Sequence, residues 1–136
     1  MSISTSVTDH LDFENVYEPA EDSFILLDAI EKDLNKIKSE LQPQFAVEIG
    51  SGSGIILCAL AENLPNCQVF ALDINPDACK ATIETAKVNN VQKKVNVVKC
   101  DFLQHFPIRN PVDLIVCNPP YVSTVEEEIR LPLKKS

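Results

Sequence analysis

The chain has 136 residues, a net charge of −8 and a hydrophobic content of 45%. This length suits one domain with one hydrophobic core. The acidic balance argues against a nucleic acid as a partner of the chain alone, because phosphate binding requires clustered Lys and Arg. It leaves a basic protein partner open.

The five cysteines of the chain indicate a reducing compartment, in which they serve as small apolar residues. No two of them form a Cys-x-x-Cys pair and their number is odd, so the sequence suggests neither a zinc site nor a disulfide framework. The N-terminus lacks the basic and apolar regions of a signal peptide, and no apolar run approaches the length of a membrane span. We therefore expect a cytoplasmic or nuclear protein without membrane contact. The cysteines are Cys58, Cys67, Cys79, Cys100 and Cys117.

The first predicted element is a helix that begins near Pro19. Residues 1–16 before it are rich in Ser, Thr and acids, and we expect them to be flexible. Within the helix, apolar residues repeat at spacings of three and four, which predicts one packing stripe. The stripe consists of Leu27, Ile30, Leu34, Ile37 and Leu41.

After Pro43 the pattern alternates between short apolar runs and helical segments. It predicts strands over 45–49, 68–72, 95–99 and 112–117, and helices over 55–63 and 75–89. Cys79, Ile83 and Ala86 would share one face of the second of these helices. The alternation indicates an α/β fold with a parallel sheet, and right-handed crossovers predict helices on both of its faces. The domain would cover residues 17–125, followed by a polar tail over 126–136.

Each predicted strand ends at a notable polar residue: Glu48, Asp73, Asp101 or Asn118. The carboxyl ends of parallel strands meet at one edge of the sheet, and ligands bind there where the strand order reverses. We therefore expect these four side chains to surround a ligand.

All three glycines of the chain fall in the segment Gly50-Ser51-Gly52-Ser53-Gly54. Glycine allows a tight turn and lets a ligand lie against bare backbone. A simple strand-to-helix turn is the alternative interpretation. Asp73 favours the ligand, because an acid at the next strand end can bind both ribose hydroxyls. Its alternative role, capping the following helix, is already filled by Asn75.

The acid before the first glycine argues against a dinucleotide. Glu48 would repel a pyrophosphate, and the glycine spacing departs from the dinucleotide pattern. S-adenosylmethionine carries a sulfonium and an ammonium and no phosphate, so it fits better. Asp101 can accept a hydrogen bond from an adenine amino group, and Phe102 can pack on the adenine ring. The alternative for this pair is a loop acid beside a core phenylalanine.

Asn118-Pro119-Pro120-Tyr121 forms a stiff corner at the end of the last strand, because proline fixes φ and removes a backbone donor. The amide oxygen of Asn118 and the carbonyl of Pro119 can each accept one hydrogen of an NH2 group, while Tyr121 stacks on its plane. The nitrogen lone pair would then point at an electrophile. The corner therefore suits transfer of a group to an amino or amide nitrogen.

Taken in order, these motifs resemble those of class I methyltransferases, and Asn-Pro-Pro-Tyr is the form found in enzymes that methylate adenine or glutamine amides. Tyr17-Glu18-Pro19-Ala20-Glu21-Asp22-Ser23 resembles the eukaryotic branch of the HemK family, the release-factor glutamine methyltransferases. The similarity covers residues 16–125. It implies a parallel sheet ordered 3-2-1-4 and N5-methylation of the glutamine in the Gly-Gly-Gln motif of the release factor. It also implies a small zinc-binding activator subunit on the edge of the third strand.

By position, the resemblance assigns the cofactor contacts to Ser23, Glu48, Gly50, Gly52, Asp73, Asp101 and Phe102. It assigns the glutamine contacts to Asn118, Pro119 and Tyr121.

The chain departs from the family in length, because family members continue through further strands. We therefore expect a C-terminally truncated, partial methyltransferase fold in which the strand over 112–117 becomes an edge. One alternative is a non-catalytic protein that competes for the activator subunit. Others are an adenine-N6 or a lysine methyltransferase. A dehydrogenase is least favoured, because Glu48 would repel the pyrophosphate of its cofactor.

Overall fold

A computed structural model describes residues 21–101 and 111–117. Several predicted features lie outside the described residues: the N-terminus over 1–16, Phe102, the segment 118–121 and the tail over 126–136. The described elements are α1 (Glu21–Lys36), the π-helical turn η1 (Ile37–Leu41), β1 (Phe45–Ile49), α2 (Ile55–Asn63), β2 (Gln68–Asp73), α3 (Pro76–Val88), β3 (Val95–Lys99) and β4 (Leu114–Cys117).

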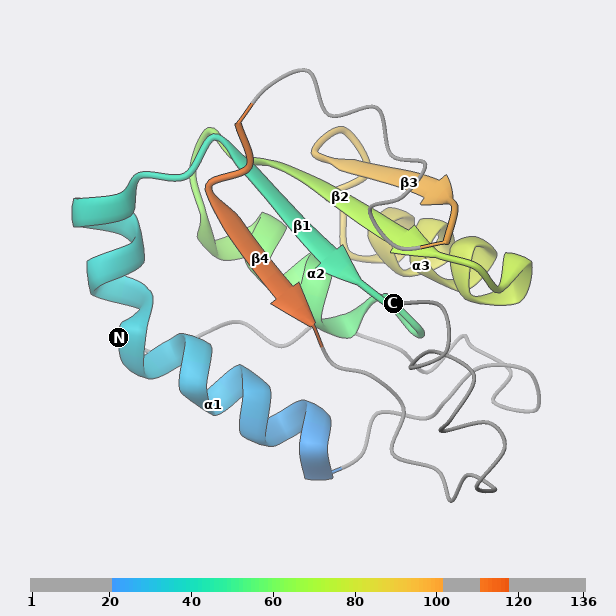
Figure 1. Ribbon diagram of the computed structural model, residues 1–136, viewed down its shortest axis with the longest axis horizontal. Coiled ribbons are helices and arrows are strands. Elements are labelled where there is room, and N and C mark those ends of the chain that lie inside the picture. Colours follow the sequence, from blue (N-terminus) through green and yellow to red (C-terminus); the bar gives the residue numbers. More distant parts are fainter. Residues whose placement is uncertain (1–20, 102–110, 118–136) are drawn as a thin grey trace, which may run out of the picture.

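The four strands form one parallel sheet in the order β3-β2-β1-β4, which confirms the predicted arrangement (Figure 1). β1 pairs with strands on both sides, so that Ile49 lies opposite Leu72 on β2 and opposite Cys117 on β4. On the far side of β2, Asp73 lies opposite Lys99 of β3. The carboxyl ends of all four strands therefore meet at one edge of the sheet.

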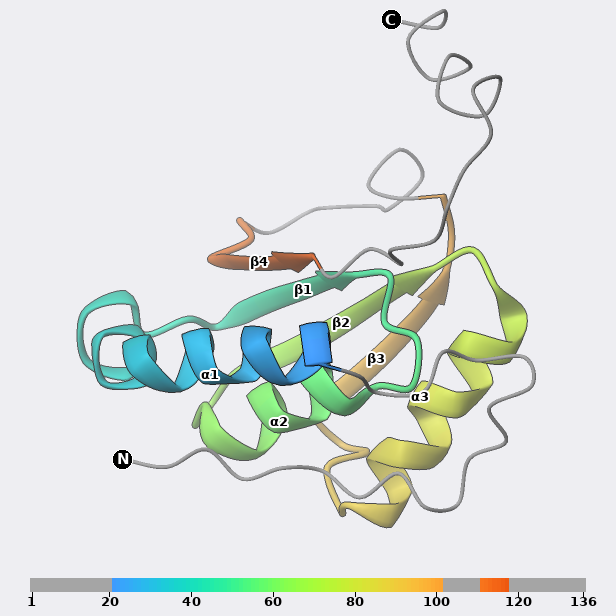
Figure 2. The same cartoon turned by 90° about the horizontal axis from the view of Figure 1, so that it is seen from below.

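The three α-helices that the structure describes pack on one face of the sheet, so the described residues do not show the predicted helices on both faces (Figure 2). The chain passes through β1, β2 and β3 in a single direction across the sheet. Right-handed crossovers that follow one direction place their helices on the same side. A helix on the second face requires a crossover in the opposite direction. The connection from β3 to β4 runs that way, and most of it lies outside the described residues.

The core fills the space between this face and the helices. α2 is buried on every side, and its residues from Ile55 to Ala61 are at most 5% exposed. A helix that is apolar all round must be covered all round. Leu27, Ile30 and Leu34 of α1 belong to the same cluster, which confirms that part of the predicted stripe. In the described ranges, no helix has both the length and the apolar character needed to cross a membrane.

Two apolar residues are more exposed than the sequence pattern predicts. Leu41 is 45% exposed because the chain ends α1 with the wide turn η1, in which the Gln42 N–H donates to the carbonyl of Ile37 at 2.8 Å. The wider turn rotates Leu41 away from the stripe. Ile83 is 42% exposed because the buried side of α3 is centred on Thr82, a polar residue outside the apolar pattern.

β4 is an edge strand within the described part of the chain, as expected, since it pairs only with β1. Val116 is buried on the helix face of the sheet. Ile115 is on the other face and 51% exposed. The described residues therefore leave this end of the second face uncovered.

The cysteines divide into a buried and a more accessible group. Cys58, Cys67 and Cys79 are buried, as expected of small apolar residues, whereas Cys117 is exposed on β4. Burial, followed by the charges of Glu48 and Glu62, raises the pKa of the Cys58 thiol to about 12. The thiol of Cys58 therefore stays protonated at neutral pH and acts as a packing group.

Candidate cofactor-binding site

The segment over residues 50–54, which we name the glycine loop, connects β1 to α2 at the carboxyl edge of the sheet. Its three glycines have φ values of +76°, +55° and +87°. Such left-handed conformations cost other residues about 1–2 kcal/mol. The N–H of Gly50 donates to the carbonyl of Leu72 at 2.7 Å, which ties the start of the loop to the end of β2.

The first two glycines leave open space beside the backbone. Among the described residues, a Cβ atom placed on Gly50 or Gly52 would have no neighbour within 4 Å. A Cβ atom on Gly54 would lie 3.0 Å from the Cα atom of Thr82. Among the described residues, one side of the loop is therefore free to receive a ligand, whereas the last residue of the loop packs directly on α3.

Asp73 lies beside the glycine loop, as the sequence predicts. Its Oδ2 accepts from the N–H of Gly52 at 3.2 Å, and its Oδ1 accepts from the N–H of Asn75 at 2.9 Å. Asn75 itself caps α3 by accepting from the N–H of Asp77 at 2.9 Å, which confirms the predicted cap. A carboxylate offers about four acceptor positions, so Asp73 can hold the loop and still accept from two ligand hydroxyls.

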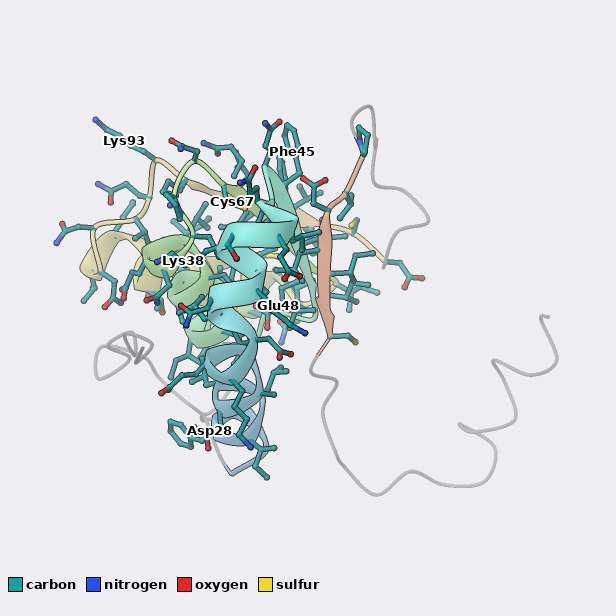
Figure 3. The ribbon with its side chains drawn as sticks, turned by 90° about the vertical axis from the view of Figure 1, so that its left-hand side faces the viewer. Asp28, Lys38, Phe45, Glu48, Cys67 and Lys93 are labelled. Atoms are coloured by element: carbon teal, nitrogen blue, oxygen red, sulfur yellow. The ribbon has the colours of Figure 1, made fainter. Side chains whose placement is uncertain are left out.

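Glu48 lies in the interior, directed toward the helix side of β1, and is 1% exposed (Figure 3). Burial raises the pKa of Glu48 well above its ordinary value, and the charge of Asp73 adds to this effect, while a backbone hydrogen bond from Leu57 opposes it. Among the described residues, Oε1 of Glu48 has no hydrogen-bond partner. A buried acceptor without a donor is costly, so this position favours a ligand that brings a cationic donor.

Two of the remaining predicted cofactor residues are described: Asp101 at the same sheet edge and Ser23 on α1. Asp101 is exposed just beyond β3, where the N–H of the preceding Cys100 donates to the carbonyl of Asp73 at 3.1 Å. Ser23 lies in the first turns of α1 and is 8% exposed. Phe102 lies outside the described residues.

The predicted substrate residues, Asn118, Pro119 and Tyr121, also lie outside the described residues. The strand that leads to them ends at Cys117, opposite Ile49. The backbone of β4 therefore ends beside the first residue of the glycine loop.

Sequence reasoning missed three residues around this edge. Ile74 follows Asp73 and is 65% exposed, so it presents an apolar side chain beside the carboxylate. Thr82 and Thr85 of α3 are fully buried against the glycine loop. Their spacing of one helical turn was a usable signal, but a search for apolar stripes passes over threonine.

The residues at this edge fit S-adenosylmethionine. Glu48 offers its ammonium group a buried oxygen that has no partner in the described part of the chain, where the backbone at Gly50 and Gly52 also leaves room for a ligand. Asp73 retains acceptor positions for its ribose hydroxyls. None of these groups requires a pyrophosphate as its partner.

Comparisons with known proteins agree with this fit. The chain is 40% identical to the eRF1 methyltransferase catalytic subunit mtq2 of Schizosaccharomyces pombe, over 93% of this chain and 61% of that protein. It is also 40% identical to methyltransferase HEMK2 of Mus musculus, over 86% of this chain and 54% of that protein. The chain thus spans little more than half the length of these relatives.

Solved structures share the fold. The ribosomal protein L11 methylase from Lactobacillus delbrueckii superimposes with a TM-score of 0.57 at 26% identity, over 71% of this chain and 47% of that chain. The N-terminal domain of human METTL16, solved in complex with SAH, gives a TM-score of 0.61 at 15% identity, over 92% of this chain and 53% of that chain. These similarities confirm a class I methyltransferase fold. The model of one family, the methyltransferase small domain, matches residues 22–132, and because this range is most of the chain, the protein belongs to that family.

Proposed function

We propose that the protein is an S-adenosylmethionine-dependent methyltransferase that modifies the glutamine side chain of a Gly-Gly-Gln motif in a translation release factor. The observation that carries the proposal is the buried Glu48 oxygen without a partner among the described residues, on a residue that precedes the open glycine backbone by two positions. A cofactor with a cationic amino group would supply the missing donor to Glu48 and could lie against the glycine backbone. The glutamine substrate is supported by the 40% identity to a relative named an eRF1 methyltransferase subunit.

In this proposal, Glu48 binds the ammonium group of the cofactor and Asp73 binds its ribose hydroxyls. The backbone of Gly50 and Gly52 lies against the amino-acid portion of the cofactor. Asp101 and Phe102 hold the adenine, and Ser23 contacts the cofactor from α1. When bound, S-adenosylmethionine supplies an electrophilic methyl group.

The substrate amide is held by the corner that follows β4. The side-chain oxygen of Asn118 and the carbonyl of Pro119 accept its two hydrogens, and Tyr121 stacks on its plane. With both hydrogens held, the nitrogen lone pair points toward the donor methyl, in line with the bond that breaks. Holding reactants in near-attack geometry contributes several kcal/mol. The nitrogen gains the methyl group as the bond from that methyl group to sulfur breaks, and it then loses one of its two hydrogens to solvent as a proton. The two acceptors also stabilise the positive charge that develops on the nitrogen.

A small zinc-binding activator subunit is the proposed partner, and the outer edge of β3 is its proposed site. Within the described residues β3 pairs only with β2, so its other edge offers backbone donors and acceptors. Cytoplasm or nucleus is the proposed location, because the five cysteines suit a reducing compartment.

The proposal is tested by methyl transfer from radiolabelled S-adenosylmethionine to purified release factor, with the chain alone and with the activator. We expect label in the Gly-Gly-Gln release factor and none in a Gly-Gly-Ala control. The Asn118→Ala variant should retain cofactor binding and lose transfer. Transfer to an adenine oligonucleotide or to lysine, with none to the glutamine, would assign a different substrate. Unchanged transfer by Asn118→Ala would remove the proposed role of that side chain.

A further inference from the structure

Two threonines of α3 hold the glycine loop from the side opposite to its open space. Thr82 and Thr85 are both 0% exposed. The hydroxyl of Thr82 donates to Oγ of Ser51 at 2.8 Å, with the carbonyl of Gly52 at 3.4 Å. The hydroxyl of Thr85 donates to the carbonyl of Ser53 at 2.7 Å.

These contacts follow the alternation of residues in the loop. Ser51 and Ser53 are each 5% exposed and meet α3 through Oγ of Ser51 and the carbonyl of Ser53, whereas the Cβ positions of Gly50 and Gly52 face open space among the described residues. The threonines therefore anchor the serines and leave the glycine backbone accessible. Such an arrangement fixes the shape of the loop without occupying its ligand side.

The loop and α3 also meet backbone to backbone. A Cβ atom on Gly54 would lie 3.0 Å from the Cα atom of Thr82. This contact sets the separation of the loop from α3, and the two hydroxyl bonds set its orientation. A segment with three glycines loses more conformational freedom on folding than a glycine-free segment of equal length. A binding site gains affinity when that freedom is removed before the ligand arrives.

We propose that Thr82 and Thr85 are positioning residues that hold the glycine loop in its cofactor-receiving conformation. They act through the loop and do not touch the cofactor. This inference rests on the proposed function, since it assumes that the ligand of the loop is S-adenosylmethionine.

Two pairs of substitutions separate positioning from simple packing. Valine keeps the shape and methyl group of threonine and removes the hydroxyl. Serine keeps the hydroxyl and removes the methyl group. If the hydroxyl bonds position the loop, valine weakens cofactor binding and serine preserves it. If the side chains only fill space, valine is tolerated and serine is the more damaging change.

The experiment compares the full chain with Thr82→Val, Thr85→Val, Thr82→Ser and Thr85→Ser. Calorimetric titration with S-adenosylhomocysteine gives the dissociation constants, and urea unfolding gives the stabilities. Leu64→Ala is the control, because Leu64 is 1% exposed beyond the far end of α2 and should affect stability alone. We expect each valine variant to bind about two- to tenfold more weakly, the range set by losing one hydrogen bond, and each serine variant to bind like the parent.

Hydrogen exchange on the unliganded chain gives a readout that does not depend on the ligand. The N–H groups of Gly52 and Gly54 are bonded to Asp73 and to the carbonyl of Ser51, at 3.2 Å and 2.9 Å. We expect the valine variants to exchange these amides faster than the parent, while amides in the middle of β1 stay protected.

Valine variants that bind like the parent, or serine variants that bind as weakly as valine variants, would overturn the inference. If the parent itself does not bind S-adenosylhomocysteine, the proposed function fails. The exchange of Gly52 and Gly54 then still decides the inference. Faster exchange in the valine variants would uphold the fixing of the loop, and unchanged exchange would reject it.

Discussion

Replacing Glu48 by glutamine should separate stability from cofactor binding. The substitution keeps the size of the side chain and removes its charge. Burial, with the charge of Asp73 as a smaller cause, raises the pKa of Glu48 in the native state above the ordinary value of 4.5. At pH values between the unfolded and the native pKa, the native state therefore retains a proton that the unfolded chain releases. The contribution of this carboxyl group to stability is fully present below pH 4.5 and is lost as the pH rises through the native pKa.

The size of the effect follows from one proton. Between the unfolded and the native pKa, the free energy of unfolding of the parent falls relative to Glu48→Gln by up to about 1.4 kcal/mol per pH unit. Glu48→Gln should therefore be at least as stable as the parent at neutral pH. Binding should change in the opposite direction. A hydrogen bond to a charged group contributes about 1.5–3 kcal/mol, so loss of the bond to the cofactor ammonium should weaken binding about ten- to hundredfold.

The assay is urea unfolding of the parent and Glu48→Gln from acidic to neutral pH, followed by calorimetric titration with S-adenosylmethionine. Glu40→Gln, an exposed substitution in η1, is the matched control and should change neither quantity. The reasoning is refuted if Glu48→Gln is less stable than the parent at neutral pH and the difference does not vary with pH. That result would mean that the carboxylate is ionised and paired in the native state.

Three further variants test the packing around the site. Gly54→Ala should destabilise the protein more than Gly52→Ala. Positive φ costs either alanine about 1–2 kcal/mol of stability, but only the Cβ atom at position 54 would also lie 3.0 Å from the Cα atom of Thr82 in α3. Equal urea midpoints of the two variants would contradict this. Lys94→Met should lower the free energy of unfolding in urea by about 1–3 kcal/mol, because Nζ of Lys94 donates to the carbonyls of Ala61 and Leu64 at the end of α2, at 2.5 and 2.6 Å. The control Lys93→Met, at an exposed position, should have no measurable effect. Asp113→Ala should lower the free energy of unfolding by about 1 kcal/mol and speed amide exchange at the start of β1. The reason is that the Asp113 carboxylate accepts from the N–H groups of Gln44 and Phe45, at 2.8 and 3.1 Å. Unchanged exchange would show that β4 pairs with β1 without the help of this carboxylate.

Element boundaries followed from local chemistry, which a sequence displays directly. α2 spans Ile55–Asn63 as predicted, because Gly54 precedes it in a left-handed conformation and apolar residues fill it. α3 begins where Asn75 and Pro76 predict, and the strands over 45–49 and 95–99 were found with the expected bounds. Each of these signals acts within a few residues of the boundary that it sets.

The errors arose where the outcome depends on packing across the chain. The side on which a helix lies depends on the direction of each crossover, and this direction is a property of the strand order. Likewise, Leu41 does not continue the predicted stripe because the π-helical turn η1 changes the helical period, and no residue near η1 predicts that turn. β4 starts at Leu114, two residues later than predicted. Asp113 lies just before it, where its carboxylate accepts from the N–H groups of Gln44 and Phe45 and its own N–H donates to the carbonyl of Phe45.

The part of the site that could be predicted follows from one rule: the carboxyl ends of parallel strands meet at the same edge of the sheet. That rule predicts from the sequence alone that Glu48, Asp73 and the glycine loop lie at one edge. It could not predict that Glu48 is fully buried with an oxygen that no described residue binds. Nor could it predict the threonines behind the loop, because their role exists only once α3 packs against residues some thirty positions earlier in the chain.

The central claim is that the carboxyl edge of this sheet seats S-adenosylmethionine against the glycine loop. A crystal structure of the chain with S-adenosylhomocysteine tests it most directly. The account predicts the amino group of the ligand within hydrogen-bonding distance of Oε1 of Glu48, and its ribose hydroxyls on the carboxylate of Asp73. A ligand bound elsewhere, or one at this edge with Glu48 still unpaired, would contradict it.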